Sequence, residues 1–174
     1  PHKSMGYKIP SNVENTYTFI VKSKGLGGEF KNLALNPTIS VRTTRTESVK
    51  VEVNPNMTSV PAEYTITYKG SKTGFMAKDI GVITLIFPPE TGIPNQIKSE
   101  LITINGNPLK TSPEIDSIRS TIKFVTPVDL ESNIQVQIKF ALDSGITNPK
   151  TAKEDYKIRL FTTTDTLPAD SATY

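Results

Sequence analysis

The fold of this chain is decided most clearly by residues 133–142, which read NIQVQIKFAL. Apolar and polar side chains alternate through this stretch, with the small Ala141 as the exception at a polar position. Successive side chains of a β-strand point to opposite faces, so the alternation predicts a strand with one apolar face and one wetted face. The apolar positions are Ile134, Val136, Ile138, Phe140 and Leu142, and the polar positions are Gln135, Gln137 and Lys139.

Four further segments carry a strand pattern. Residues 81–87 are apolar on both faces, as a central strand requires, and Pro88 and Pro89 end this segment because proline cannot donate to a ladder. The other three alternate with a period of two. Their predicted inward residues are Val49, Val51 and Val53, then Tyr64, Ile66 and Tyr68, and then Tyr156, Ile158 and Leu160.

Turn residues separate these predicted strands. Asn105 and Gly106 lie between two short β segments and favour a two-residue hairpin, since both turn positions need positive φ. Residues 120–125 give another short strand, and residues 93–100 give one short helical turn at most. From Ser48 onward we expect about seven or eight strands, which predicts an all-β fold, an immunoglobulin-like antiparallel β-sandwich.

Composition narrows the function classes. The 174 residues include no cysteine, which excludes disulfides, thiolate nucleophiles and cysteine-based zinc sites. The net charge is +3, and the lysines are scattered along the chain. A nucleic-acid site would cluster Lys and Arg on one stripe, so we read this charge as solubilising. Only four basic residues are arginines: Arg42, Arg45, Arg119 and Arg159.

An internal repeat suggests how the chain is divided. Residues 7–21 and 122–138 each show a short strand, a proline-containing turn and a long alternating strand, and threonine-rich segments follow Asn36-Pro37 and Asn148-Pro149. We therefore expect residues 1–46 to be the last strands of a preceding, partial sandwich module, and residues 47–174 to be one nearly complete module. A chance likeness between two threonine-rich β segments is the alternative.

A partial module needs a partner. Three strands alone bury too little apolar surface to be stable. We expect the first segment to be completed by strands upstream in a longer chain, by a neighbouring molecule through strand addition, or by packing on the second module.

The second module resembles a known family. The phrases that carry the resemblance are VKVEVNP (49–55), AEYTITY (62–68), GVITLIFPPETGIP (81–94), LITING (101–106), GITNPKTA (145–152) and LFTTTDT (160–166). In this order they resemble the immunoglobulin-like repeat module of S-layer and other cell-surface proteins of clostridial and related Gram-positive bacteria. The resemblance implies an extracellular β-sandwich repeated in tandem, and it brings no catalytic, cofactor-binding or metal-binding residue.

The residues that could support catalysis are few. The single histidine, His2, would have to serve any Ser-His-Asp triad, and we expect it to lie in a frayed terminal segment. Two acidic pairs, Asp129 with Glu131 and Glu154 with Asp155, are candidates for acid–base catalysis, but we expect them to be solvated turn residues. The glycine-rich stretch 25–28 lacks the Gly-Lys-Ser/Thr ending of a phosphate loop. We therefore predict that the protein is not an enzyme and needs no cofactor.

The sequence also contains candidate residues for other kinds of ligand site. Calcium is one candidate cofactor, since the turn carboxylates Asp116, Asp143 and Asp165 could bind it, although no EF-hand-type loop is present. Lys50 and the Asn148 region have the approximate topology of an intramolecular Lys–Asn cross-link. Asn56-Met57-Thr58 is an N-glycosylation sequon.

Sugar binding is the main rival function. Carbohydrate modules stack sugar rings on exposed aromatic side chains, but this chain has no tryptophan. Four of its tyrosines are predicted to point inward: Tyr17, Tyr64, Tyr68 and Tyr156.

Three functions follow from these observations. The first is a non-enzymatic structural spacer or assembly unit of a secreted, S-layer-type cell-surface protein, whose partners are neighbouring modules or subunits. The second is an adhesin or binding module for proteins or for cell-wall or plant glycans. The third is a subunit of an extracellular filament assembled by strand exchange.

Overall fold

A computed structural model describes residues 16–17, 21–24, 30–33, 39–40 and 43–174, and the chain divides into two compact units, Pro1–Thr43 and Thr44–Tyr174. In the first unit, β1 (Thr16–Tyr17) pairs with β4 (Ile39–Ser40), and β2 (Val21–Lys24) pairs with β3 (Phe30–Leu33). Both pairs are antiparallel. His2 and the glycines of residues 25–28 lie outside the described residues, as does the side chain of Tyr17, and a sandwich origin for residues 1–46 stays a prediction.

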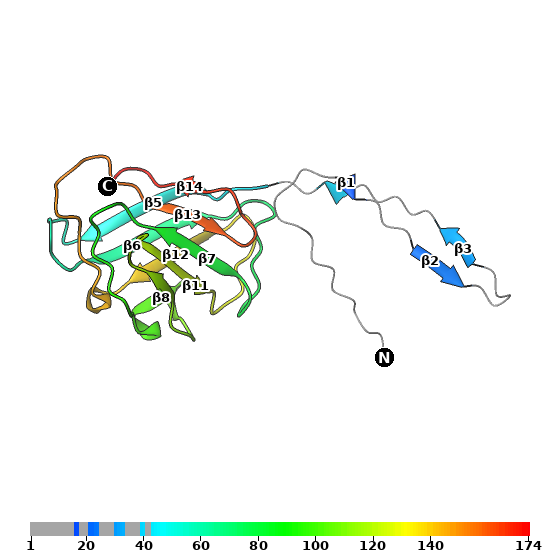
Figure 1. The fold of residues 1–174 in the computed structure, drawn as a ribbon, viewed down its shortest axis with the longest axis horizontal. Coiled ribbons are helices and arrows are strands. Elements are labelled where there is room, and N and C mark those ends of the chain that lie inside the picture. Colours follow the sequence, from blue (N-terminus) through cyan, green and yellow to red (C-terminus); the bar gives the residue numbers. More distant parts are fainter. Residues whose placement is uncertain (1–15, 18–20, 25–29, 34–38, 41–42) are drawn as a thin grey trace. The chain divides into compact units, whose positions relative to one another are not determined.

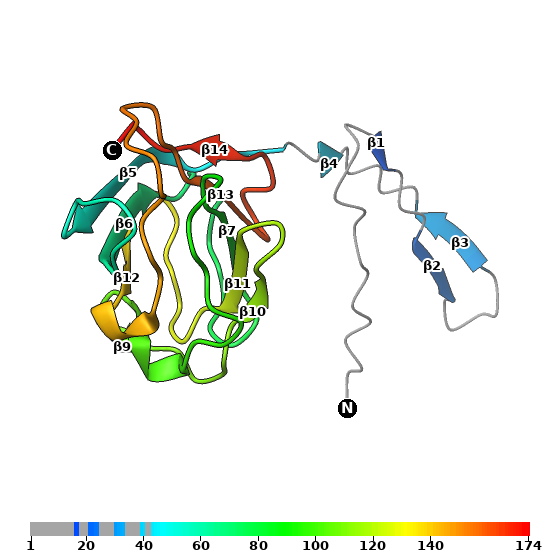
Figure 2. The same cartoon turned by 60° about the vertical axis from the view of Figure 1, so that its left-hand side comes forward.

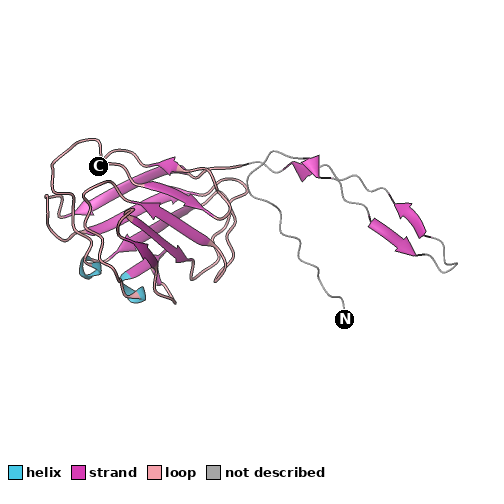
Figure 3. Cartoon of the chain, in the orientation of Figure 1, coloured by secondary structure: helices cyan, strands magenta, loops and turns pink. Residues whose placement is uncertain are grey.

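The second unit is an antiparallel β-sandwich of two five-stranded sheets, which confirms the predicted fold class (Figures 1 and 3). Two short 3₁₀ helices, Ser99–Leu101 and Leu142–Ser144, are the helical elements of the described chain. The first sheet runs β5 (Glu47–Asn54), β6 (Glu63–Lys69), β12 (Gln135–Phe140), β8 (Ile102–Ile104) and β9 (Asn107–Pro108). The second runs β10 (Glu114–Asp116), β11 (Thr121–Val125), β7 (Val82–Ile86), β13 (Arg159–Thr162) and β14 (Ala169–Asp170).

The alternating segments supply the core between the sheets. Tyr64, Ile66 and Tyr68 are at most 1% exposed, as predicted. Residues 82–86 form β7, the middle strand of the second sheet, which agrees with the expectation for a segment that is apolar on both faces. The predicted hairpin is also present, because Asn105 and Gly106 have φ of 50° and 79° and join β8 to β9.

Edge-to-face aromatic pairs run through the centre of this core. The ring of Phe140 lies 5.9 Å from that of Phe87 and 6.2 Å from that of Phe124, measured between centroids. Phe87 in turn lies 5.5 Å from Tyr64. Such pairs add about 0.5–1.5 kcal/mol each beyond the area they bury, so this chain of rings joins the two sheets.

Three residues predicted to point inward do not lie in the core. Ile134 is 40% exposed and Leu142 is 49% exposed, because β12 covers only 135–140 and both residues lie in the turns beyond it. Tyr156 is partly exposed, since β13 begins only at Arg159. Ile158 and Leu160 are fully buried, as predicted.

The strand registers define two ends of the sandwich. The proximal end holds the start of β5 and the loops 70–81, 126–134 and 163–168. The distal end holds the end of β5, the loops 55–62, 87–101 and 141–158, and Tyr174 (Figure 2). The chain therefore enters this unit at the proximal end and reaches residue 174 at the distal end.

The last residues close one side of the sandwich. We call residues 167–172 the closing segment. It pairs with β13 of the second sheet through β14, and it also donates hydrogen bonds to the stretch around the start of β5 in the first sheet, from Leu167 N–H to the Thr44 carbonyl (3.0 Å) and from Ala172 N–H to the Val49 carbonyl (2.9 Å). The two sheets are thus joined along this side by backbone hydrogen bonds.

Candidate functional site

A groove with a volume of about 410 Å³ lies at the distal end. It lies between the loop after β5, the loop before β13 and the chain end. Its lining combines amide, hydroxyl, ammonium and carboxylate groups with two tyrosines, a set that can hydrogen-bond to a polar chain and pack against its apolar parts. The lining residues are Val53, Asn56, Met57, Thr58, Asn148, Pro149, Thr151, Ala152, Lys153, Glu154, Tyr156, Thr173 and Tyr174.

Asn148 holds one wall of this distal groove in place. Its side chain is buried, and its amide nitrogen donates to the backbone carbonyls of Pro55 (2.8 Å) and Met57 (2.7 Å). Its amide oxygen accepts a hydrogen bond from the hydroxyl of Tyr64 (2.7 Å). The Asn148 amide therefore fastens the loop after β5 to the core.

The opposite wall is a loop organised by Glu90. One carboxylate oxygen of Glu90 accepts hydrogen bonds from the backbone N–H (3.2 Å) and the hydroxyl (2.8 Å) of Thr151. The carbonyl of Thr151 then accepts from the hydroxyl of Tyr156 (2.7 Å). This hydrogen bond of the hydroxyl fixes the Tyr156 ring in the groove wall. The ammonium of Lys153 lies 5.8 Å from the centroid of the ring.

A second, smaller groove of about 330 Å³ lies on the other side of the same loop. Lys153 and Tyr156 line both grooves, so they form the ridge between them. The second groove also contains Arg159 and Asp170, which form an ion pair at 2.7 Å. Its other lining residues are Ile86, Phe87, Pro88, Pro89, Asp155 and Lys157.

The charges beside this second groove act on Asp170. Its hydrogen bond with the Arg159 guanidinium lowers the pKa of the Asp170 carboxyl, and the charges of Arg159, Lys157 and Arg45 lower it further. The same hydrogen bond raises the pKa of Arg159. Both groups are largely exposed, so the pair orients β13 against β14 and adds little stability.

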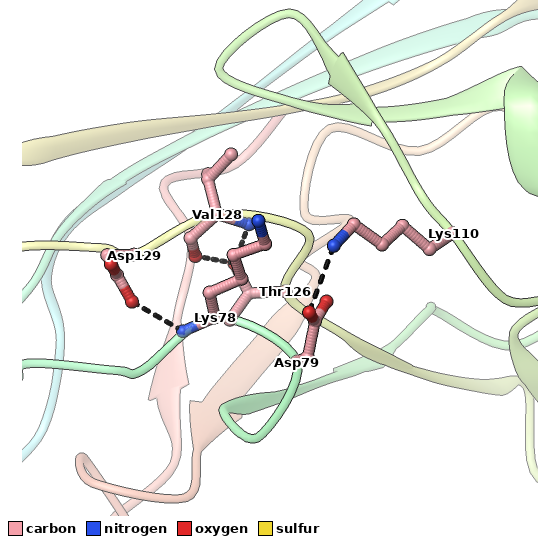
Figure 4. A network of polar contacts seen from close by, with 6 residues as sticks. All are labelled: Lys78, Asp79, Lys110, Thr126, Val128 and Asp129. Carbon is pink, nitrogen blue, oxygen red and sulfur yellow. Dashed lines mark hydrogen bonds and ion pairs between the residues drawn. The ribbon is translucent and has the colours of Figure 1, made fainter.

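The acidic pairs weighed for catalysis are exposed turn residues. Glu154 and Asp155 lie in the loop before β13, and Asp129 and Glu131 lie in the proximal loops. One oxygen of Asp129 accepts a hydrogen bond from the backbone N–H of Lys78 at 2.7 Å (Figure 4), so this carboxylate caps a turn.

Neighbouring turns at the proximal end are fixed in similar ways. Figure 4 shows the ammonium of Lys110 paired with Asp79 at 2.9 Å, and this bond raises the pKa of Lys110. It also shows the hydroxyl of Thr126 donating to the Val128 carbonyl at 2.7 Å. These contacts hold the loops that join the two sheets.

Asp165 was a candidate calcium ligand in an exposed turn, but the structure places it in the interior with no exposed surface. One of its oxygens accepts a hydrogen bond from the Ser71 backbone N–H at 3.0 Å, and its own backbone N–H donates to the hydroxyl of Thr162. Asp116 forms an ion pair with Arg119, and Asp143 is exposed. Among the residues that the structure describes, no three acidic, histidine or cysteine side chains gather in one place.

The Lys50–Asn148 cross-link finds no support in this geometry. Lys50 is exposed on the polar face, as its alternation indicated, whereas the buried Asn148 amide nitrogen is used by two backbone carbonyls. All three sequon residues, Asn56, Met57 and Thr58, line the distal groove.

Sequence reasoning missed the distal groove. Its residues come from three loops that are far apart in the sequence, and no local period marks them. The sequence signal nearest to this groove is the high content of Pro, Asn and Thr in residues 54–58 and 147–151. This composition predicts two ordered turns, but it does not predict that the two turns lie side by side.

Comparison with solved structures finds similarity in fold to a known protein. No protein-family profile matches the chain, and no curated protein matches it. The crystal structure of BslA, described as a bacterial hydrophobin, is similar with a TM-score of 0.47 and 15% sequence identity, over 76% of this chain and 94% of that one. A likeness at this level carries no functional inference. In the described residues no helix combines the length and apolarity needed to cross a bilayer.

We predict that Asn148→Ala lowers the free energy of unfolding by about 3 kcal/mol. The change leaves one buried hydroxyl and two carbonyls without their partner, and each such loss costs about 1–3 kcal/mol before relaxation. Urea unfolding followed by near-UV circular dichroism measures it. Asn56→Ala is the matched control in the exposed part of the same groove and should change stability by less than about 0.5 kcal/mol. Equal effects of the two changes would show that Asn148 does not hold the loop.

Proposed function

We propose that residues 44–174 are a non-enzymatic structural module of a secreted cell-surface protein of the S-layer type, acting as a spacer between its neighbours. The observation that carries this proposal is the path of the chain through the sandwich. The chain enters at the proximal end, beside Thr44, and Tyr174 lies at the distal end. The eight residues of β5 alone cover about 26 Å of this path, at about 3.3 Å per residue.

Such a path suits a spacer. When the two ends of a module lie on opposite sides, each added module extends the molecule by its own long dimension. When they lie on the same side, the chain folds back on itself. The packed aromatic core supports this role as well, because close-packed protein interiors have low compressibility.

The sheet edges favour a spacer over a filament subunit built by strand exchange. The edge strands β9, β10 and β14 have only two or three residues each, and short edges are poor templates for an added strand. On the long edge strand β5 the Val49 carbonyl accepts a hydrogen bond from the closing segment of its own chain, and Thr44, just before β5, accepts another. The start of this edge is therefore already occupied within the molecule.

Surface labelling tests the proposed location. Antibodies raised against residues 44–174 should label intact cells of the source organism without permeabilisation, since a secreted surface module faces the medium. Labelling that appears only after the cells are permeabilised would refute a surface role. An antibody against a cytoplasmic protein serves as the control for cell integrity.

The distal groove favours a second candidate function, a surface binding module for a glycan or an extended peptide. Its fixed Tyr156 ring presents an aromatic surface between two grooves, and Lys153, Asn56 and Thr58 add hydrogen-bonding groups around it.

A glycan array and a peptide array test this second function. We expect Tyr156→Ala to remove binding of any ligand found, with a loss of about tenfold or more, because stacking on an aromatic ring contributes on the order of 1–3 kcal/mol. Gln137→Ala, on the exposed face of β12, is the control and should bind normally. Unchanged binding by the Tyr156 variant would exclude the groove as the site.

A further inference from the structure

The first stretch of the sandwich unit, residues 44–49, and the closing segment are hydrogen-bonded to each other in a parallel direction. Leu167 N–H bonds to the Thr44 carbonyl, and Ala172 N–H bonds to the Val49 carbonyl. From the first bond to the second, both stretches advance by five residues (167 to 172 and 44 to 49). The closing segment and the first strand therefore run parallel, both from the proximal to the distal end, although every strand ladder within the two sheets is antiparallel.

Each of these stretches is also anchored to a different sheet. β5 pairs with β6 from Lys50 to Asn54 in continuous register. On the other side, Ser171 N–H bonds to the Ile158 carbonyl (2.8 Å), and the Ser171 hydroxyl accepts from the Ile158 N–H (3.0 Å). The Arg159–Asp170 ion pair lies next to these bonds. Neither stretch can slide unless bonds to its own sheet or to the other stretch break.

This arrangement has a mechanical consequence. Tension applied between Thr44 and Tyr174 pulls β5 out of the proximal end and the closing segment out of the distal end. Backbone hydrogen bonds between strands run across the strand direction. The bonds between these two stretches therefore lie across the force, and they carry the load together instead of opening one after another.

We propose that the parallel contact between residues 44–49 and residues 167–172 is a mechanical clamp, which lets the module bear tension along its length without unfolding. This inference rests on the proposed function, because a spacer at a cell surface is loaded between its two ends. This proposal gives the closing segment a mechanical role, which the packing of the core does not by itself require. A sandwich can bury its core without any bond between its first and last strands.

Single-molecule force spectroscopy on the full chain tests the clamp directly. The protein has no cysteine, so two introduced cysteines give unique attachment points. In the shear geometry the handles are Thr43→Cys and a cysteine added after Tyr174. In the peeling geometry they are Thr43→Cys and Pro168→Cys, two exposed positions that both lie at the proximal end.

We expect a higher unfolding force in the shear geometry than in the peeling geometry at the same loading rate. Peeling opens the Leu167–Thr44 bond first and the Ala172–Val49 bond later, whereas shear loads both at once. The two proteins share the same fold and nearly the same sequence, so stability alone cannot produce the difference. Equal forces in the two geometries would overturn the proposal.

A pair of proline variants locates the clamp. Ala172→Pro removes the N–H that bonds to Val49, and we expect unfolding under constant shear force to become about fivefold faster. Thr173→Pro is the matched control one residue further on, where no backbone N–H bond is made within the described residues, and its rate should stay close to that of the parent. If Ala172→Pro does not fold, the comparison of the two pulling geometries still decides.

The two proposals can fail separately. A clear difference between shear and peeling, together with antibody labelling confined to permeabilised cells, would keep the clamp and reject the surface location. Surface labelling without a mechanical difference would do the opposite.

Discussion

Replacing Phe140 by alanine is expected to lower the free energy of unfolding by about 3–5 kcal/mol, one of the two largest effects predicted for this protein. Phe140 is fully buried and lies on β12, the middle strand of the first sheet. Its ring contacts Phe87 and Phe124 edge to face. Alanine removes both aromatic pairs and leaves a cavity where the two sheets meet. Urea unfolding monitored by near-UV circular dichroism, which reports the buried tyrosines nearby, measures the loss.

The neighbouring residue provides the control for this change. Lys139 lies on the same strand but points to the solvent, where its ammonium pairs with Glu63 at 2.9 Å. Lys139→Ala should therefore cost no more than about 1 kcal/mol, the usual upper range for an exposed ion pair. Phe140→Leu removes the aromatic contacts but keeps most of the side-chain volume. It should therefore lower the free energy of unfolding by less than Phe140→Ala does. A Phe140→Ala protein as stable as the parent would contradict the packing described for this core.

The second large effect is a steep loss of stability in alkali. Burial raises the pKa of Tyr64, Tyr68 and Tyr174 far above the ordinary value of a phenol, and nearby Asp165 raises that of Tyr68 further. In the unfolded chain the same phenols ionise near pH 10, at about their ordinary pKa. Above that pH the unfolded state therefore binds fewer protons than the folded state, and stability falls as the pH rises.

The size of this loss follows from the number of buried phenols. Each one lowers the free energy of unfolding by about 1.4 kcal/mol per pH unit above pH 10, as long as it stays protonated in the folded state. For Tyr64 and Tyr68 together we expect about 3–4 kcal/mol between pH 10 and pH 11.5. Below pH 9 these groups have no effect. Urea unfolding at a series of pH values tests the slope.

Single Tyr→Phe variants assign the slope to named residues. Tyr68→Phe removes a buried hydroxyl that has no hydrogen-bond partner among the described residues, so it should keep or raise stability at pH 7 while reducing the alkaline slope. Tyr64→Phe also reduces the slope, but it takes away the donor to Asn148 and should cost about 1 kcal/mol at pH 7. If ultraviolet absorbance shows every tyrosine of the folded protein ionising near pH 10, the explanation is wrong.

The distal groove and the closing segment support two separate functional proposals for the same unit. The groove could bind a ligand without any load on the chain, and the clamp could bear tension with the groove empty. Tyr174 lines the groove and lies two residues beyond the closing segment, and its ring lies 6.3 Å from that of Tyr64, edge to face. Ligand binding and resistance to force can therefore be measured on the same set of variants.

The sequence by itself determined which face of each central strand is buried. The alternation in residues 133–142 assigned Val136, Ile138 and Phe140 to the core, and they are at most 1% exposed. The Asn105-Gly106 pair was enough to place the hairpin between β8 and β9. These features are local: strand geometry fixes the side-chain direction, and the turn needs only two residues that accept positive φ.

Only the tertiary structure decided where the strands stop and which distant residues meet. Ile134 and Leu142 continue the alternation in sequence, yet they lie outside the strand because their neighbours at the two ends turn away. Asp165 reads as a solvated turn acid, but it is buried because the loop 70–74 covers it and supplies the Ser71 N–H.

The two features on which the functional proposals rest lie furthest from what the sequence could show. The Asn148 amide bonds to residues 84–93 positions away, and the clamp joins residues separated by 123 positions (167 − 44 and 172 − 49). No periodic pattern in the sequence predicts contacts of this kind, because the two partners are far apart in the chain and neither depends on the local sequence of the other. They appear only when the two sheets pack and bring the first and last strands side by side.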